Sequence, residues 1–205
     1  KLSYIKEPFC MKCGKALSSE EEYCPDCMRH PRSFDGGAAL FHYNEAARRS
    51  MAAIKYKNRR EYLDFYSQAL VSRYGKWLSH IRPDALVPVP VHPARRRKRG
   101  FNQAEELAER ISLLTGIPVR ADLLIRIRKT LPQKELNPAE RLNNLRLAFA
   151  VSDFYKARPE QIPRRVVLAD DIYTTGSTME ACTRVLKAAG VKQVYIMSIC
   201  IGKGR

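Results

Sequence analysis

The residue types most able to do chemistry stand together in residues 166–178, Val-Val-Leu-Ala-Asp-Asp-Ile-Tyr-Thr-Thr-Gly-Ser-Thr. The apolar run Val166 to Ala169 predicts a buried parallel strand. Asp170 and Asp171 follow at its carboxyl end, where open α/β sheets bind their ligands. Two adjacent carboxylates can accept hydrogen bonds from two vicinal hydroxyls of a ribose, and they can help to hold Mg²⁺.

A hydroxyl-rich loop comes directly after the acid pair and contains Thr174, Thr175, Gly176, Ser177 and Thr178. Ser177 with Glu180 has the spacing of a capping box, which predicts a helix that starts at this point. The free N–H groups and positive dipole end of such a helix suit a phosphate. The alternative is an ordinary strand, turn and helix. The order of acid pair, loop and helix favours a site for ribose 5-phosphate.

The N-terminal region carries two cysteine pairs, Cys10-x-x-Cys13 and Cys24-x-x-Cys27. Four thiolates in two short-spaced pairs suit tetrahedral Zn²⁺, and four protein ligands predict a structural site. Disulfides are the alternative, but no feature of the chain indicates secretion. The other two cysteines, Cys182 and Cys200, lie on predicted apolar faces and are interpreted as core residues.

A second predicted strand, loop and helix spans residues 85–116. Its loop holds the five consecutive basic residues Arg95 to Arg99, and Asn102 with Glu105 predicts the cap of the following helix. A basic run is often only a solvated surface. Its place between a strand's carboxyl end and a capped helix favours a binding role here.

Basic and amide side chains also recur in residues 126–149, among them Arg126, Arg128, Gln133 and Arg141. Pro132 and Pro138 interrupt regular structure in this stretch. We expect either a mobile loop that closes over a bound pyrophosphate or a plain surface connection.

The charge of the whole chain is strongly positive, with 37 Lys and Arg against 21 Asp and Glu and a formal net charge of +16. This favours anionic partners such as phosphorylated metabolites, nucleic acid or an acidic membrane face, or else a basic but solvated surface.

Residues 45–57 and 59–78 are predicted helices. In the second helix Leu63, Tyr66, Leu70, Tyr74 and Trp77 recur at helical spacing, which favours a core face over a platform for stacking single-stranded DNA. With no apolar run near 18 residues, no transmembrane helix is expected.

Residues 166–178 resemble the phosphoribosyl-pyrophosphate (PRPP) motif of type I phosphoribosyltransferases. The resemblance implies that Asp170 and Asp171 bind the ribose diol and that residues 174–178 wrap the 5-phosphate. It also implies contacts to pyrophosphate from the basic loop. With the later stretch included, the pyrophosphate or loop candidates are Arg95, Arg99, Gly100, Asn102, Gln103, Arg126, Arg128, Gln133 and Arg141. The implied fold is α/β, a parallel sheet flanked by helices in residues 35–205, after a small four-cysteine zinc-binding domain in residues 1–34.

Taken together, the cysteine pairs, Pro-Val-Pro-Val, Arg-Gly-Phe-Asn-Gln, Arg-Ile-Arg-Lys-Thr-x-x-Gln and the PRPP motif are similar to the ComF family, specifically ComFC. That resemblance implies a role in natural transformation and the handling of incoming single-stranded DNA on the cytoplasmic side of the inner membrane. It also implies peripheral membrane association and contacts with the DNA-uptake machinery. An active phosphoribosyltransferase with an unidentified acceptor and a PRPP- or nucleotide-sensing regulator are the alternatives, and the catalytic residues are not identified from the sequence.

Overall fold

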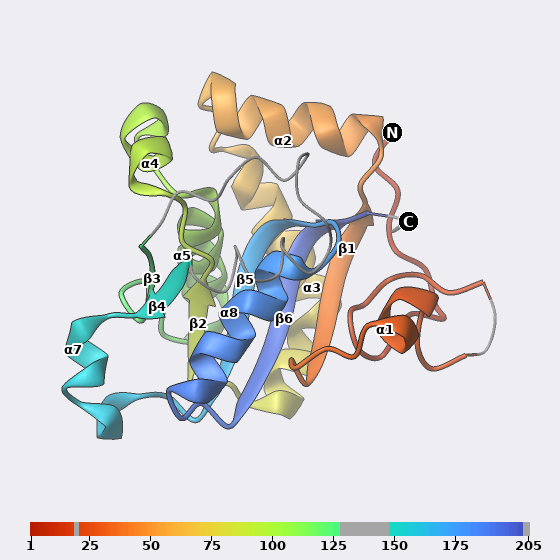
Figure 1. Ribbon diagram of the computed structural model, residues 1–205. Coiled ribbons are helices and arrows are strands. Elements are labelled where there is room, and N and C mark those ends of the chain that lie inside the picture. Colours follow the sequence, from red (N-terminus) through yellow and green to blue (C-terminus); the bar gives the residue numbers. More distant parts are fainter. Residues whose placement is uncertain (19–20, 128–147, 203–205) are drawn as a thin grey trace.

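The computed structural model of the chain describes residues 1–18, 21–127 and 148–202. Its centre is a four-stranded parallel sheet (Figure 1) whose order is β1 (Gly36–His42), β6 (Gln193–Ile201), β5 (Arg165–Tyr173) and β2 (Ala85–Pro88). The two central strands are apolar along most of their length because helices cover both faces of the sheet. The expected parallel α/β sheet flanked by helices is therefore confirmed.

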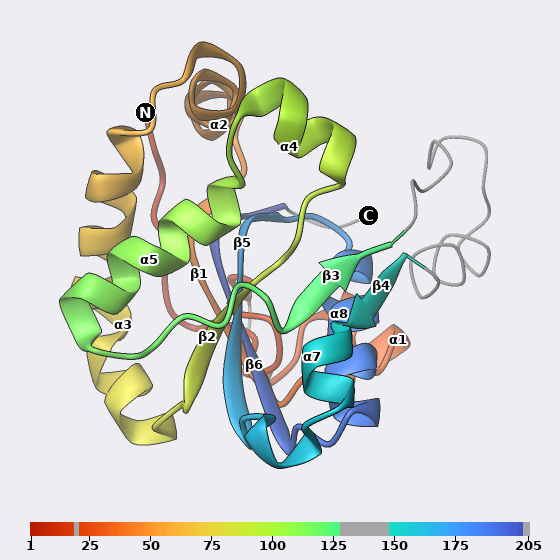
Figure 2. The ribbon, with the colours of Figure 1, turned by 90° about the vertical axis from the view of Figure 1, so that its left-hand side faces the viewer.

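Helices lie on both faces of this sheet, as the two views at right angles show (Figures 1 and 2). One face carries α3 (Tyr62–Ile81) and α5 (Gln103–Thr115), and the other carries α8 (Ser177–Ala188) and the short α1 (Pro25–Arg29). Two further helices follow strand ends and lie above the carboxyl edge of the sheet, namely α2 (Glu45–Lys57) after β1 and α4 (Pro93–Arg99) after β2. Beside α8, a two-stranded antiparallel sheet and two short turns of helix complete the described elements, β3 (Leu124–Arg126), β4 (Phe149–Val151), α7 (Asp153–Lys156) and η2 (Pro159–Gln161).

The side chains of β5 alternate between two apolar cores, one on each face of the sheet. Val166 and Leu168 join the core beneath α8, while Val167 and Ala169 join the core beneath α3 and α5. Tyr66 and Tyr74 of α3 are buried in the second core. The interpretation of the aromatic stripe in residues 59–78 as a core face is therefore confirmed. Cys182 and Cys200 are buried core residues, also as predicted.

The N-terminal cysteine region packs against the edge strand β1. Gly14 has a φ of +76° in the left-handed region, and a Cβ added there would lie 2.9 Å from the carbonyl oxygen of Gly37. Gly14 thus permits both the turn and the close approach of this region to β1. All four cysteines belong to the same apolar core as Met179 and Leu186 of α8. The domain boundary near residue 34 stays a prediction.

Three local predictions are wrong in detail. The run Arg95 to Arg99 is not a loop but most of helix α4, with His92 as its N-cap and Pro93 in its first turn. The helix expected from residue 59 begins at Tyr62, because Asn58 adopts a left-handed φ of 54° and ends α2. The capping box at Ser177 is not formed, since Gly176 is the N-cap of α8 and Glu180 bonds elsewhere. Of the described part of the chain, no helix has the length and hydropathy needed to span a membrane.

Candidate functional site

The acid pair lies near the carboxyl end of β5, and its two members have different surroundings. Asp171 is only 3% exposed and accepts a hydrogen bond of 2.9 Å from Nε2 of Gln103. Its other carboxylate oxygen forms an ion pair with Nζ of Lys55 on α2. A buried carboxylate with a cationic partner and an amide donor is held in one orientation. Asp171 is therefore an anchored acid.

Asp170 is more exposed than Asp171, and it lies close enough to Asp171 to feel the charge of that carboxylate. Its Oδ1 accepts a hydrogen bond of 2.9 Å from the backbone N–H of Asp171. Burial of the carboxyl group, followed by the negative charge of Asp171, raises the pKa of Asp170 well above its usual range. The charge of Lys55 acts in the opposite direction. A ligand that donates hydrogen bonds or brings a cation would favour the ionised form of Asp170.

The loop after the acid pair presents exposed hydroxyls and the start of α8. Thr174 and Thr175 are exposed, and Oγ of Ser177 lies 2.9 Å from Oγ1 of Thr175. Gly176 has a φ of +75°, and a Cβ there would come within 2.2 Å of the Tyr173 hydroxyl. Only glycine therefore fits at this position. The loop leads into a 12-residue helix whose N-cap, Gly176, provides no capping side chain, so the N-terminus of the helix suits an anion.

The Arg-Gly-Phe-Asn-Gln segment, residues 99–103, links α4 to α5, and its last residue contacts Asp171. Asn102 is buried and caps α5 by accepting from the backbone N–H of Ala104 at 3.1 Å, while its amide donates to the Val89 carbonyl at 3.1 Å. Arg99 donates to the side chain of Gln103, which in turn donates to Asp171. Gly100, with a φ of +84°, ends α4. In this structure the segment orients Asp171.

Arg95 and Arg126 form the basic side of the site. Burial and then the positive charge of Arg95 lower the pKa of Arg126, while Asp170 is close enough to act in the opposite direction. The Arg126 guanidinium also lies over the ring of Phe149, at 5.2 Å from its centroid. Two neighbouring cations beside an acid pair suit a polyanion carrying a divalent metal. Arg128, Gln133 and Arg141 lie outside the described residues.

The four N-terminal cysteines form a compact cluster. Their sulfur atoms all lie within 4.8 Å of one another, all four residues are buried, and Sγ of Cys13 lies 3.7 Å from Sγ of Cys24. The Cys13 and Cys27 thiols, together with backbone groups of Cys24 and Cys13, lower the pKa of Cys10. The Cys10 thiol is also the main cause that raises the pKa of Cys27 to about 12. Four crowded thiols cannot all ionise without strong mutual repulsion. A bound dication would neutralise the thiolates, so the cluster could hold a metal ion.

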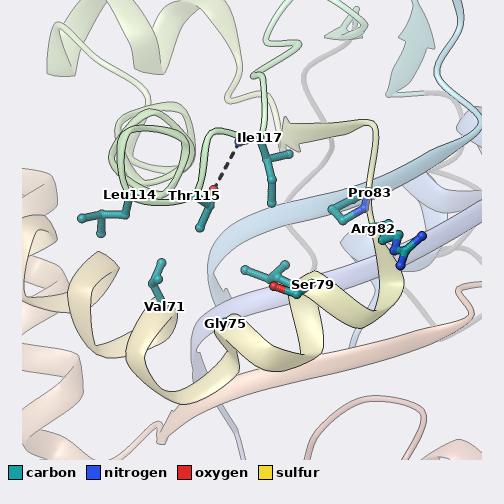
Figure 3. A pocket seen from close by; sticks show the side chains of 9 residues that line it. Val71, Gly75, Ser79, Arg82, Pro83, Leu114, Thr115 and Ile117 are labelled. Atoms are coloured by element: carbon teal, nitrogen blue, oxygen red, sulfur yellow. Dashed lines mark hydrogen bonds between the residues drawn. The ribbon is translucent and has the colours of Figure 1, made fainter.

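The pocket drawn in Figure 3 is a different place on the molecule. It has a volume of about 440 Å³ and lies between α3, α5 and the approach to β2, where Val71, Leu114 and Ile117 line it. Pro83, just before the start of β2, is also part of its lining, so the pocket opens near the amino end of that strand. None of the predicted site residues lines it.

Sequence reasoning missed Lys55 as a member of the site and gave no role to residues 32–34. Lys55 follows the buried residue Met51 by four positions, so both lie on the same face of α2. That spacing places a lysine at the border of an apolar face, which is the signal that could have found it. No comparable signal marks Arg32 and Ser33, because their partners are 143 and 147 residues away in the chain.

The fold and the carboxyl-edge site define a phosphoribosyltransferase-type protein. Residues 83–205 match the family described as "Phosphoribosyl transferase domain", to which this chain belongs. In particular, it belongs with the competence proteins F and ComFC. It is 30% identical to "Competence protein ComFC" of Streptococcus pneumoniae over 95% of this chain and 81% of that protein.

Two further relatives and one solved structure are similar to the chain. Identity is 29% to "Competence protein F" of Haemophilus influenzae, over 94% of this chain and 84% of that protein. Identity is 26% to "DNA utilization protein YhgH" of Salmonella typhimurium, over 93% of this chain and 83% of that protein. The crystal structure of a purine phosphoribosyltransferase from Pyrococcus horikoshii superposes with a TM-score of 0.40 and 15% identity, over 68% of this chain and 84% of that chain.

Proposed function

We propose that the protein binds PRPP with Mg²⁺ at the carboxyl edge of its sheet. The observation that carries this proposal is the arrangement of three chemically different groups around one edge, the acid pair, the loop 174–178 and the cations Arg95 and Arg126. A ribose diol suits the acids, a terminal phosphate suits the loop, and a pyrophosphate suits the cations. Mg²⁺ would supply charge neutralisation of the pyrophosphate oxygens.

Titration calorimetry with PRPP and Mg²⁺ tests the proposal. Replacement of both acids by alanine should weaken PRPP binding by at least about 100-fold, because several charge-assisted hydrogen bonds are lost. Simple electrostatics predicts the opposite sign, since removing two negative charges should attract the anion. Asp170→Asn alone avoids disturbing the anchored acid, and Asp153→Ala, an exposed acid on α7, is the matched control. Unchanged affinity in the double variant would refute the site.

We further propose that the protein acts in natural transformation and handles incoming single-stranded DNA on the cytoplasmic side of the inner membrane. The competence relatives support this role, as do the charge of +16 and the exposed basic residues of α4, Arg95 to Lys98. Exposed Tyr56, over which Arg99 lies at 5.7 Å, offers a stacking surface nearby. Partners in the DNA-uptake machinery and a peripheral contact with anionic lipid are part of the same proposal.

Anisotropy of a labelled oligothymidylate tests the DNA proposal. Affinity should fall steeply with added salt, because bound lysines and arginines release counterions from the phosphates. Combined replacement of Arg95, Arg96 and Arg97 by alanine should flatten the salt dependence by about two units of slope. No binding at low salt would contradict the proposal. An unchanged slope of affinity against salt in the triple variant would mean that DNA does not contact these arginines of α4.

The match to the phosphoribosyl transferase family favours a second candidate, an active transferase. In that reaction an acceptor would attack C1 of the ribose, the bond from C1 to the pyrophosphate oxygen would break, and pyrophosphate would leave with the electron pair. The acceptor's proton would pass to solvent. Arg95 and Arg126 would stabilise the leaving charge. Pyrophosphate release, screened across bases and amines with and without single-stranded DNA, separates a transferase from a protein that only binds PRPP.

For the cysteine cluster we propose a structural Zn²⁺. Four thiolate ligands leave no open position for substrate, and the cluster is part of an apolar core. Metal analysis of the purified protein should give about one zinc per chain, and a Cys13→Ser variant should lose it. Disulfide formation between the pairs would be the contrary result.

A further inference from the structure

Three consecutive residues after the cysteine cluster, Arg32, Ser33 and Phe34, contact the loop 174–178 and the residues on either side of it. Nη2 of Arg32 donates to the carbonyl oxygen of Thr175 at 2.8 Å, inside the loop. Both the backbone N–H and the hydroxyl of Ser33 donate to the carboxylate of Glu180 on α8, at 2.8 and 2.7 Å. The ring of Phe34 packs edge-on against Tyr173, just before the loop. One short segment therefore contacts the loop itself, the residue that precedes it and the helix that follows it.

These contacts are of the kind that fix a backbone. Glu180 is 1% exposed, so its carboxylate depends on the donors that reach it. Burial opposes its ionisation, but the hydrogen bonds from Ser33 and Arg184 outweigh burial and lower the pKa of Glu180. Thr175 is exposed, and its hydroxyl lies beside that of Ser177 within the same loop. The guanidinium of Arg32 thus supplies a restraint on the loop from a distant part of the sequence.

The segment is itself fixed by the cysteine cluster. Phe34 is fully buried in the same core as Cys10, Cys13, Cys24 and Cys27. Arg32 comes only five residues after Cys27, so it lies within about 18 Å of the last cysteine of the cluster. A metal that holds the four sulfurs would therefore hold the start of this segment against α8.

We propose that Arg32 and Ser33 are positioning residues for the 5-phosphate loop, and that the metal-bound cysteine module supports that loop through them. The inference rests on the proposed PRPP site and deepens it. It assigns the N-terminal module a task in ligand binding that is separate from holding its own fold. Preorganised backbone N–H groups bind an anion with less ordering cost, so a loosened loop binds more weakly.

Ribose 5-phosphate is the probe of choice because it engages the loop without a pyrophosphate. Arg32→Ala and Ser33→Ala should each weaken its binding by about 5- to 10-fold, the loss expected for one or two hydrogen bonds. Their affinity for inorganic pyrophosphate should change less than twofold (about 0.4 kcal/mol). Zinc content near one per chain and a single cooperative melting transition show that the module is intact in each variant. Arg164→Ala, an exposed arginine at the amino end of β5, is the charge-matched control.

Glu180→Gln should change ribose 5-phosphate affinity in opposite directions depending on whether Glu180 acts through its charge or by anchoring Ser33. If only net charge mattered, removing an anion near the loop would tighten ribose 5-phosphate binding. If Glu180 anchors Ser33, the amide would present an N–H group to the Ser33 donors, and binding would weaken. Unchanged affinity in Arg32→Ala and Ser33→Ala, or tighter binding in Glu180→Gln, would overturn the inference. If the wild-type protein bound neither PRPP nor ribose 5-phosphate, the proposed function would fail first and the inference with it.

Discussion

At the scale of single residues, the two adjacent aspartates do different jobs. Asp171 is enclosed between Lys55 and Gln103, whereas Asp170 is a partly exposed residue with no ion pair of its own among the described residues. The sequence places both acids at a strand end, because an apolar run is a local signal. It does not separate their roles, because Lys55 and Gln103 reach Asp171 from helices 116 and 68 positions away in the chain.

Replacing Lys55 tests the anchored acid. Lys55→Met should lower the free energy of unfolding by about 3 kcal/mol, since it leaves a buried carboxylate without its counter-charge. PRPP affinity should fall with it, and Lys55→Arg should restore part of both. Lys57→Met, at the exposed end of the same helix, is the control and should change stability by less than about 0.5 kcal/mol. Urea titrations of the three variants measure the difference; equal effects at positions 55 and 57 would rule out an anchored Asp171.

The raised pKa of Asp170 gives a pH-dependent prediction. Between the unfolded and folded pKa values of this acid, the folded state binds more protons, so stability falls as pH rises through that interval. Asp170→Asn removes this cost. The variant should therefore melt higher than wild type at pH 7.5, by ~2–4 °C for each kcal/mol relieved, and the advantage should disappear toward pH 3. Thermal melts across pH measure it, and a variant that melts lower at pH 7.5 would contradict the raised pKa.

At the scale of elements, the strands and long helices could be predicted and the helix ends could not. Val166 to Ala169 form a continuous apolar run, and α5 carries clear apolar periodicity. Cap positions depend on single hydrogen bonds. Asn102 caps α5 as predicted, whereas Ser177 does not cap α8, because Gly176 is the N-cap and Glu180 is hydrogen-bonded to Ser33 instead. The basic run Arg95 to Arg99 is helical rather than a loop, because His92 caps the helix and Pro93 fixes its first turn.

Asn102 joins a helix cap to a strand end, and its loss should cost more than that of an ordinary cap. Asn102→Ala should lower the free energy of unfolding by about 2 kcal/mol or more, because the α5 cap and the donor to the Val89 carbonyl are both removed. Asn44→Ala also removes a helix cap and an amide donor, to the Lys1 carbonyl, but at a partly exposed site where water replaces the lost bonds, so it should cost about 1 kcal/mol. Urea unfolding of both variants compares them, and a smaller loss at Asn102 would show that its contacts are dispensable.

At the scale of the whole molecule, the cysteine cluster and the α8 face of the sheet share one core. The sequence predicts the four ligands from their spacing, but it carries no signal of where the module docks. That docking depends on Gly14 fitting against β1 and on Phe34 reaching Tyr173. A shared core implies that the module and the sheet unfold together.

Metal removal tests this shared core. Chelation should lower the melting temperature by ~5 °C or more and leave a single cooperative transition, because loss of the metal exposes crowded thiols that belong to the core beneath α8. A chelator already saturated with zinc is the control and should have no effect. Scanning calorimetry distinguishes the outcomes: two separate transitions, with the upper one unmoved by chelation, would mean that the sheet is stable without its N-terminal module. In that case the loop at residues 174–178 would keep its phosphate affinity after metal loss, whereas a shared core predicts that melting temperature and ribose 5-phosphate affinity fall together.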